Sequence, residues 1–130
     1  MPPSVNPVLD ASALICLARC EPGWQRVAEH GISCDLSAVN LVEVAYRLSA
    51  HGMPLEAVES IVRPIIGRVV PFDDQQAMIA AGIHAKTRDG GLSLADCACL
   101  ALAISRNAAV ITADKKWKTL KLGIEIVQIR

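Results

Sequence analysis

The sequence is poor in aromatic residues, which make up 3% of its 130 residues, and it has no excess of charge of either sign. Its aromatic side chains are too few to predict a base-stacking platform for single-stranded nucleic acid. Thirteen basic residues balance thirteen acidic ones, which argues against binding nucleic acid through bulk electrostatic attraction. The balance still permits a local site in which the two signs are separated.

Long hydrophobic runs and targeting signals are also missing from the sequence. The longest apolar run covers residues 97–104, far short of the ~20 residues needed to span a bilayer. Residues 1–7 have neither the basic nor the apolar region of a signal peptide. We therefore expect a soluble, cytoplasmic protein that makes no use of a membrane.

The cysteines lack the pattern of a zinc site or of a redox pair. There are five, an odd number, with no C-x-x-C spacing, and His30, His51 and His84 do not combine with them into the clustered spacing of a zinc site. We expect all five to be small buried residues in a reducing compartment.

The sequence is instead rich in small and aliphatic residues. Apolar residues make up 52% of it and charged residues 20%, which excludes a disordered chain. Its length and the absence of repeats or linker-like stretches predict a single domain over residues 1–130.

Short apolar segments alternate with helical patterns along the chain. The predicted strands cover residues 5–9, 32–36, 68–72, 109–112 and 124–129. The predicted helices cover residues 11–20, 24–30, 38–50, 54–66, 74–87, 94–106 and 115–120. This alternation predicts a three-layer α/β/α fold: a mostly parallel sheet of about five short strands with helices on both faces.

Four carboxylates lie where such a fold would bring them together. Asp10 follows the first predicted strand and Asp114 follows the fourth. Glu43 lies in the helix after the second strand, and Asp96 lies in the first turn of the helix before the fourth. Ligands of open α/β sheets bind beyond the carboxyl ends of the strands, so these acids are candidate site residues.

Each acid also has a structural explanation. Asp10 and Asp114 can cap the helices that follow them, and Asp96 stands three residues after Ser93, the spacing of a capping box. Glu43 is four residues before Arg47, the spacing of a surface ion pair on a helix.

Two features favour a functional role over these explanations. The helix that carries Asp96 is apolar on all sides, which predicts that it is buried, and a carboxylate there is costly without a partner or a cation. Glu43 is the polar residue of an apolar stretch and shares a helix face with Asn40 and Arg47. That face is either solvated or lines a cleft.

Clustered carboxylates repel one another, and without a counterion some of them must take up a proton. Mg²⁺ resolves this repulsion because it prefers oxygen ligands and is often held by one or two carboxylates together with substrate phosphates. Phosphodiester hydrolysis suits such a site, since metal ions stabilise the attacking and leaving oxygens.

Four segments of the chain resemble the four motifs of PIN-domain nucleases. They are residues 8–14 (VLDASAL), 40–44 (NLVEV), 91–97 (GLSLADC) and 110–114 (VITAD), the last followed by Trp117. Their order and spacing agree over essentially the whole chain. The size and short loops are most similar to the toxin component of VapBC-type toxin–antitoxin pairs.

The resemblance implies a nuclease that cleaves RNA with Mg²⁺, or with Mn²⁺ in its place. Asp10, Glu43 and Asp96 would bind metal and act in catalysis, with Asp114 as a fourth acidic ligand. Ser12 would place a hydroxyl near the metal or the scissile phosphate, and Thr112 would orient Asp114. The implied partners are tRNA or rRNA as substrate, a small antitoxin that covers the acidic cleft, and a second copy in a homodimer.

A basic cluster follows the last of these motifs directly. Lys115, Lys116 and Lys118 belong to the densest group of basic residues in the chain. They either form a solvated helix end or hold the phosphates that flank the scissile one. An acidic cleft beside a basic rim agrees with a net charge of zero.

Other families fit the acids less well. A receiver domain needs paired acids at the end of its first strand, and an aspartyl-nucleophile phosphatase needs Asp-x-Asp, where this chain has Asp10 and Ser12. The stronger alternative is a catalytically inactive PIN-like module that binds RNA or protein. DNA also remains an alternative substrate, since no residue here predicts a contact to the RNA 2′-hydroxyl.

Overall fold

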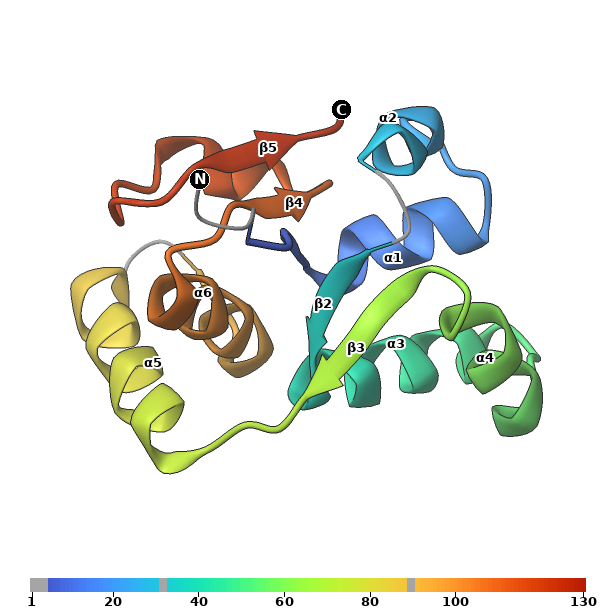
Figure 1. Cartoon of the computed structure of the whole chain (residues 1–130), viewed down its shortest axis with the longest axis horizontal. Helices are drawn as coiled ribbons and strands as arrows, with labels where there is room; N and C mark the ends of the chain where they lie inside the picture. The colour runs from blue at the N-terminus through green and yellow to red at the C-terminus, as the bar shows by residue number, and fades with distance from the viewer. Residues whose placement is uncertain (1–4, 31–32, 89–90) are drawn as a thin grey trace.

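The protein is seen in a computed structural model that describes residues 5–30, 33–88 and 91–130. Its centre is a five-stranded sheet in the order β3-β2-β1-β4-β5, and all four pairs of neighbouring strands are parallel. Helices pack on both faces of this sheet (Figure 1). The predicted three-layer α/β/α fold is confirmed.

The elements follow one another in the predicted order. The strands are β1 (Val8–Leu9), β2 (Cys34–Ser37), β3 (Ile66–Val70), β4 (Val110–Thr112) and β5 (Ile126–Gln128). The α-helices are α1 (Ala11–Ala18), α2 (Trp24–Glu29), α3 (Ala38–Ala50), α4 (Leu55–Val62), α5 (Asp74–Lys86) and α6 (Leu94–Arg106), and a 3-10 helix, η2, covers Lys115–Thr119.

Two prolines account for the largest differences from the predicted boundaries. The predicted helix 54–66 ends at Val62, because Pro64 cannot continue a helix, and Ile66 already belongs to β3. Pro7 has no N–H to donate, and β1 begins only after it. The predicted strand 32–36 begins at Ile32, which lies outside the described residues.

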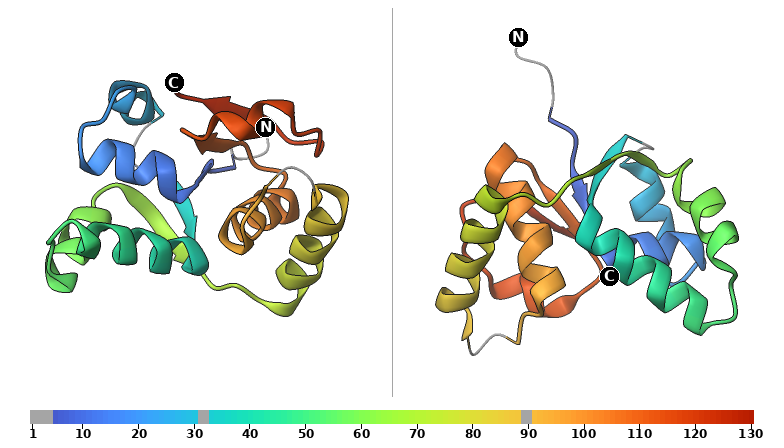
Figure 2. Two further views of the ribbon diagram at one scale, coloured as in Figure 1. Left: turned by 180° about the vertical axis from the view of Figure 1, so that it is seen from behind. Right: turned by 90° about the horizontal axis from the view of Figure 1, so that it is seen from below.

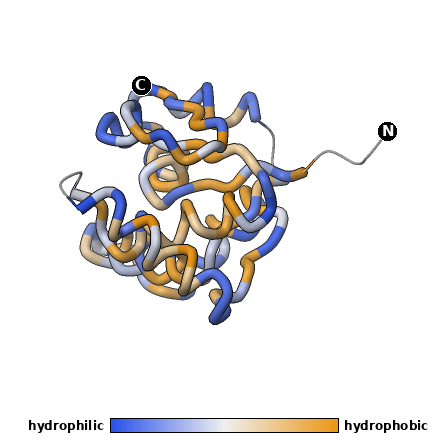
Figure 3. The backbone as a smooth tube through the Cα atoms, turned by 90° about the vertical axis from the view of Figure 1, so that its left-hand side faces the viewer, coloured by the Kyte–Doolittle hydropathy of each residue, from blue (hydrophilic) through white to orange (hydrophobic). Residues whose placement is uncertain are grey.

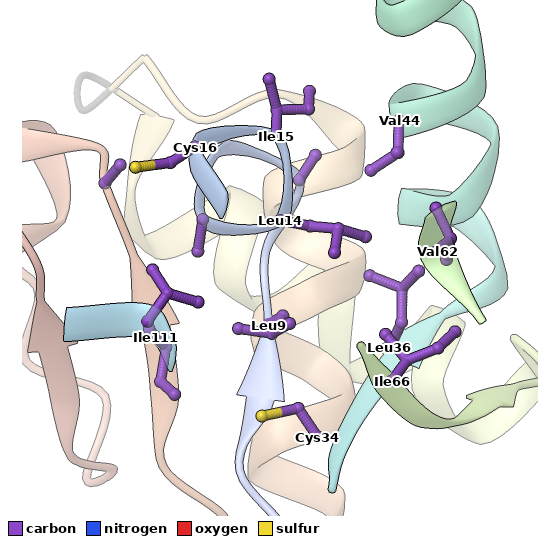
Figure 4. Close-up of a cluster of buried hydrophobic side chains, with 14 of the residues drawn as sticks. Leu9, Leu14, Ile15, Cys16, Cys34, Leu36, Val44, Val62, Ile66 and Ile111 are labelled. Atoms are coloured by element: carbon purple, nitrogen blue, oxygen red, sulfur yellow. The ribbon is translucent and has the colours of Figure 1, made fainter. Parts of the chain in front are cut away.

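The hydrophobic core lies on both faces of the sheet, because successive strand residues point to opposite sides. Leu9 and Ile111 belong to the cluster that packs against α1, α3 and α4, as Figure 4 shows around Leu9. Val8 and Val110 belong to the cluster on the other face, under α5 and α6. Figure 2 shows these two helix groups on opposite sides of the strands.

The burial of individual residues mostly follows the sequence pattern. The most hydrophilic stretches of the chain lie mainly at its outer turns (Figure 3). Four cysteines are buried as expected, but Cys20 is exposed, so the prediction that all five are buried is wrong for that residue. Cys20 lies just beyond α1 at a positive φ of 52°, in a turn that leaves the core. Within the described ranges, no helix has the length and apolar character that a membrane span requires.

The strand order fixes the position of one crevice. The chain lays β2 and β3 on one side of β1, then places β4 and β5 on the other side. The carboxyl ends of β1 and β4, which are neighbours, therefore mark the point where the order reverses, and ligands of such sheets bind there. Leu9 is in register with Ile111, so the next residues along both strands, Asp10 and Thr112, lie side by side.

Candidate functional site

All four predicted acids line one small pocket at this crevice. Asp10, Glu43, Asp96 and Asp114 surround a cavity of about 60 Å³. The remaining lining residues are Ala11, Ser12 and Arg47. This acidic pocket combines the ends of β1 and β4 with residues of α1, α3 and α6, segments that are far apart in the sequence.

Asp10 lies deepest in the acidic pocket, with 4% of its surface exposed. It caps α1, because its Oδ1 accepts a hydrogen bond of 2.8 Å from the backbone N–H of Ala13. Its carboxylate also accepts hydrogen bonds from the hydroxyls of Ser12, at 2.8 Å, and Thr112, at 2.6 Å. The capping interpretation and the functional interpretation of Asp10 are therefore compatible.

Burial of Asp10 disfavours the ionised form of its carboxyl group. Burial raises the pKa of its carboxyl from 3.8 to about 6, although the hydrogen bonds from Thr112, Ala13 and Ser12 oppose this rise. The negative charge of Asp96 raises the pKa further. Asp10 is thus a carboxylate that lacks sufficient counter-charge, and a bound cation would supply it.

Ser12 and Thr112 tie the two sides of the pocket together. Ser12 Oγ accepts a hydrogen bond of 3.0 Å from the backbone N–H of Ala113, and Thr112 Oγ1 accepts one of 2.9 Å from that of Asp114. Each hydroxyl thus donates to Asp10 while it accepts from the segment that leads to Asp114. This network holds Ser12 and Thr112 against Asp10, and their supporting roles stay predictions.

Asp96 combines helix capping with a place in the pocket. Its Oδ2 accepts a 2.9 Å hydrogen bond from Ser93 N–H, and Ser93 Oγ accepts one of 3.1 Å from Asp96 N–H, which completes a capping box. The predicted burial of this helix is confirmed for residues 97–103, which are continuously buried. It is wrong for the first turn, where Asp96 is half-buried and Leu94 is 78% exposed.

Glu43 lines the pocket from α3, together with a positive charge. Arg47 Nη1 lies 3.9 Å from Glu43 Oε2, and both side chains are partly exposed. Of the predicted face of Asn40, Glu43 and Arg47, the last two residues line the acidic pocket. Asn40 is 1% exposed and donates to the Ala95 carbonyl, at 3.1 Å, and to Glu43 Oε1, at 3.5 Å.

Asn40 thus connects α3 to the first turn of α6, and with it Glu43 to Asp96. No sequence pattern indicates this link, because the partner atom is a backbone carbonyl 55 residues away. The sequence placed Arg47 on the same helix face as Glu43 and at the spacing of an ion pair, but the packing of α3 decides that it lines the pocket.

The buried thiol of Cys99 lies within electrostatic reach of three of the acids. Burial raises the pKa of Cys99 well above its usual value, and the negative charges of Asp10, Asp96 and Glu43 raise it further. Cys99 Sγ lies 3.7 Å from the Leu9 carbonyl, directly beneath the end of β1. The three acids therefore act on the same small volume, as their sequence positions predict.

The basic cluster begins at the edge of the acidic pocket. Asp114 caps η2 through a 2.9 Å hydrogen bond from Lys116 N–H, and Lys116 Nζ lies 3.9 Å from Asp114 Oδ2. Lys116 Nζ also donates to the Gly91 carbonyl at 3.3 Å, which links η2 to the segment before α6. Lys115 and Lys118 are exposed. Lysines thus lie beside the pocket, as the interpretation of a basic rim requires.

The donor set suits a hard divalent cation. It consists of carboxylate and hydroxyl oxygens, the ligands that Mg²⁺ prefers, and Mg²⁺ retains several waters, so one or two direct carboxylate ligands suffice. In the described part of the chain, no three carboxylate, imidazole or thiol groups are close enough to form a ready-made metal centre. The chemistry of these residues therefore fits a partly hydrated divalent ion, and the buried Asp10 is the acid whose charge such an ion would offset most.

Comparison with known proteins gives one family and a set of similar folds. The sequence model of a family described as the PIN domain matches residues 8–122. No curated protein matches the chain significantly.

Three solved structures illustrate the similarity of fold. A toxin–antitoxin complex from Klebsiella pneumoniae has a TM-score of 0.76 at 16% identity, with 96% of this chain and 98% of that chain covered. DNA-bound VapBC from Salmonella typhimurium has a TM-score of 0.73 at 20% identity, with 98% and 100% covered. A member of the VapBC family of toxin–antitoxin systems from Mycobacterium tuberculosis has a TM-score of 0.67 at 21% identity, with 97% and 100% covered.

Proposed function

The chain belongs to the PIN domain family, whose model matches residues 8–122, and from this premise we propose that it is a metal-dependent endoribonuclease. In this proposal residues 1–130 form one nuclease domain that hydrolyses RNA phosphodiester bonds with Mg²⁺, or with Mn²⁺ in its place. The observation that carries it is the convergence of four carboxylates from four parts of the sequence on one pocket. A structural protein has no need to place mutually repelling acids together.

The residues have distinct roles in this proposal. Asp10, Glu43 and Asp96 hold the cation, and Asp114 acts as a fourth acidic ligand, directly or through water. When bound, the cation neutralises the acids, polarises the phosphate and activates water. Ser12 and Thr112 orient Asp10 through the hydrogen bonds of their hydroxyls.

The basic rim has a separate role in substrate binding. Lys115, Lys116 and Lys118 hold phosphates that flank the scissile one. The exposure of all three lysines, and the place of Lys116 beside Asp114, support this assignment.

The direct test is cleavage of structured RNA by the purified protein with Mg²⁺, with and without a chelator. We expect cleavage that the chelator abolishes and that Glu43→Gln and Asp96→Asn remove. Asp73→Asn is the matched control, because Asp73 also caps a helix through a 2.8 Å hydrogen bond from the N–H three residues later, on α5, and does not line the acidic pocket. Metal-independent cleavage, or full activity of Asp96→Asn, would refute the assignment of the acids. Absence of cleavage by the wild-type protein with Mg²⁺ would favour the non-catalytic binding module.

We also propose that this nuclease is the toxin of a type II toxin–antitoxin pair that acts on tRNA or rRNA. Similar folds that cover nearly the whole chain, including toxin–antitoxin complexes, support this role. We expect the chain alone to arrest growth in its host and a small protein encoded next to it to relieve the arrest and co-purify with it. Soluble expression without growth arrest would contradict the toxin role and leave the nuclease assignment intact.

The proposed homodimer has a candidate surface on α3. Val42 and Tyr46 lie four residues apart on this helix, hence on one face, and are 69% and 76% exposed. Light scattering should give twice the mass of the chain, and Val42→Asp/Tyr46→Asp should halve it. A monomeric wild-type protein would rule out the homodimer.

A further inference from the structure

The acidic pocket contains one cationic side chain, Arg47, among the described residues that line it. Arg47 stands one helical turn after Glu43 on α3, and its Nη1 lies 3.9 Å from Glu43 Oε2. That distance is too long for a direct hydrogen bond, and 48% of the Arg47 side chain is exposed. Arg47 is therefore held only loosely, at the open side of the pocket.

Such a contact contributes little to the stability of α3, since exposed ion pairs of this spacing are weak. Its consequence is electrostatic. Without a metal ion, Arg47 supplies positive charge to a pocket with four carboxylates. When a divalent cation enters, it repels the guanidinium and competes with it for the Glu43 carboxylate.

We propose that Arg47 exchanges Glu43 for a substrate phosphate when the divalent cation binds. The planar guanidinium offers paired N–H donors that match the non-bridging oxygens of a phosphate. Because Arg47 already lines the pocket, a short movement of its flexible side chain keeps it beside the bound ion. In this position it binds RNA at the pocket itself, whereas the lysines of the rim bind phosphates further along the strand.

This inference rests on the proposed nuclease function, and it makes two predictions of opposite sign. Removal of the Arg47 charge should strengthen cation binding, because a competing and repelling charge is lost. The same change should weaken RNA binding, because a phosphate contact is lost. If Arg47 only stabilised α3, its removal would not strengthen cation binding and weaken RNA binding at the same time.

The chain provides a matched control for the test. Arg63 lies four residues after Glu59 on α4, in the same arrangement, with Arg63 Nη2 3.2 Å from Glu59 Oε1. Neither residue lines the acidic pocket. Arg63→Ala therefore removes a surface ion pair of the same spacing, one that is also hydrogen-bonded, without a change to the proposed site.

The experiment compares wild type, Arg47→Ala, Arg47→Lys and Arg63→Ala in two assays. Electron paramagnetic resonance of free Mn²⁺ gives the dissociation constant for Mn²⁺ alone, and steady-state cleavage of a short fluorescent RNA with Mg²⁺ gives kcat and KM. We expect Arg47→Ala to bind Mn²⁺ several-fold more tightly and to raise KM about tenfold, the loss of one charge-assisted hydrogen bond, with little change in kcat. Arg47→Lys should bind Mn²⁺ like wild type, with an intermediate KM, and Arg63→Ala should match wild type in both assays.

Three results would overturn the inference. Equal behaviour of Arg47→Ala and Arg63→Ala in both assays would show that Arg47 only forms a surface ion pair. Weaker Mn²⁺ binding by Arg47→Ala would show that Arg47 holds Glu43 in place for the metal. A wild-type protein that neither binds Mn²⁺ nor cleaves RNA would refute the nuclease function, and the role of Arg47 with it.

Discussion

The raised pKa of Asp10 predicts how the stability of the metal-free protein depends on pH. The carboxyl titrates at about 6 in the folded protein, against 3.8 for the ordinary group. Its folded form therefore binds more protons than its unfolded form between these two values, and the free energy of unfolding falls as the pH rises through this window. Above about pH 6 the buried anion destabilises the fold by a constant amount.

The size of this effect follows from the two pKa values. A difference of one in pKa corresponds to about 1.4 kcal/mol, so ionised Asp10 costs about 3 kcal/mol at pH 7. Asp10→Asn removes the charge and keeps an oxygen that can accept the Ala13 N–H hydrogen bond of the α1 cap. We expect its stability relative to wild type to rise by about 2.4 kcal/mol between pH 4 and pH 7, because a small part of the cost is already present at pH 4.

Urea unfolding at several pH values with a chelator present measures this difference. Other titrating groups are common to both proteins and largely cancel. Asp73→Asn is again the control, since the exposed Asp73 carboxylate caps α5 from solvent, and its difference from wild type should vary far less with pH. A difference between wild type and Asp10→Asn that stays constant from pH 4 to pH 7 would refute the assignment of a costly buried charge.

Four further predictions follow from the same site. Saturating Mg²⁺ at pH 7 should raise the melting temperature of wild type but not of Asp10→Ala, because an ion present at a hundredfold excess over Kd adds about 2.7 kcal/mol to stability; an equal rise in both would place the ion elsewhere. Asp96→Asn should abolish RNA cleavage with a change in the free energy of unfolding of about 1 kcal/mol or less, since the amide oxygen can still accept the Ser93 N–H hydrogen bond; wild-type cleavage would leave Asp96 as a cap only. Thr112→Val removes a hydrogen bond that lowers the pKa of Asp10, so half-maximal Mn²⁺ binding should move to higher pH, and an unchanged titration would contradict this role. Lys115→Ala/Lys116→Ala, measured in an Asp96→Asn background, should weaken RNA binding and reduce its salt slope by about 0.7 for each lost contact to single-stranded RNA, with Mg²⁺-induced stabilisation intact; coincident slopes would show that the RNA path lies elsewhere.

The sequence by itself determined the fold class and the identity of the four acids. Short apolar segments alternate with helical patterns, and this order is sufficient to predict a parallel sheet covered on both faces. Parallel strands present their carboxyl ends at one edge, so the positions of Asp10 and Asp114 directly after strands indicated their proximity. These features are local in the sequence and depend on periodicity, which is why they could be predicted.

Tertiary structure alone decided which polar groups surround each acid. Asp96 was expected in a buried helix, yet burial of α6 begins only at Cys97, and the apolar pattern of the helix does not show that limit. The link from Asn40 to the Ala95 carbonyl and the place of Arg47 in the pocket depend on how α3 lies against α6. The buried carboxylate of Asp35 likewise pairs with Arg106 across 71 residues of sequence, at 2.5 Å.

The physical reason is the range of the interactions. Periodicity and capping act within a few residues, so a sequence displays them directly. Burial, the pKa of Asp10 and the counter-charge supplied by Arg47 depend on atoms from several elements at distances of a few ångströms. Those neighbours exist only once the strands have paired and the helices have packed on them.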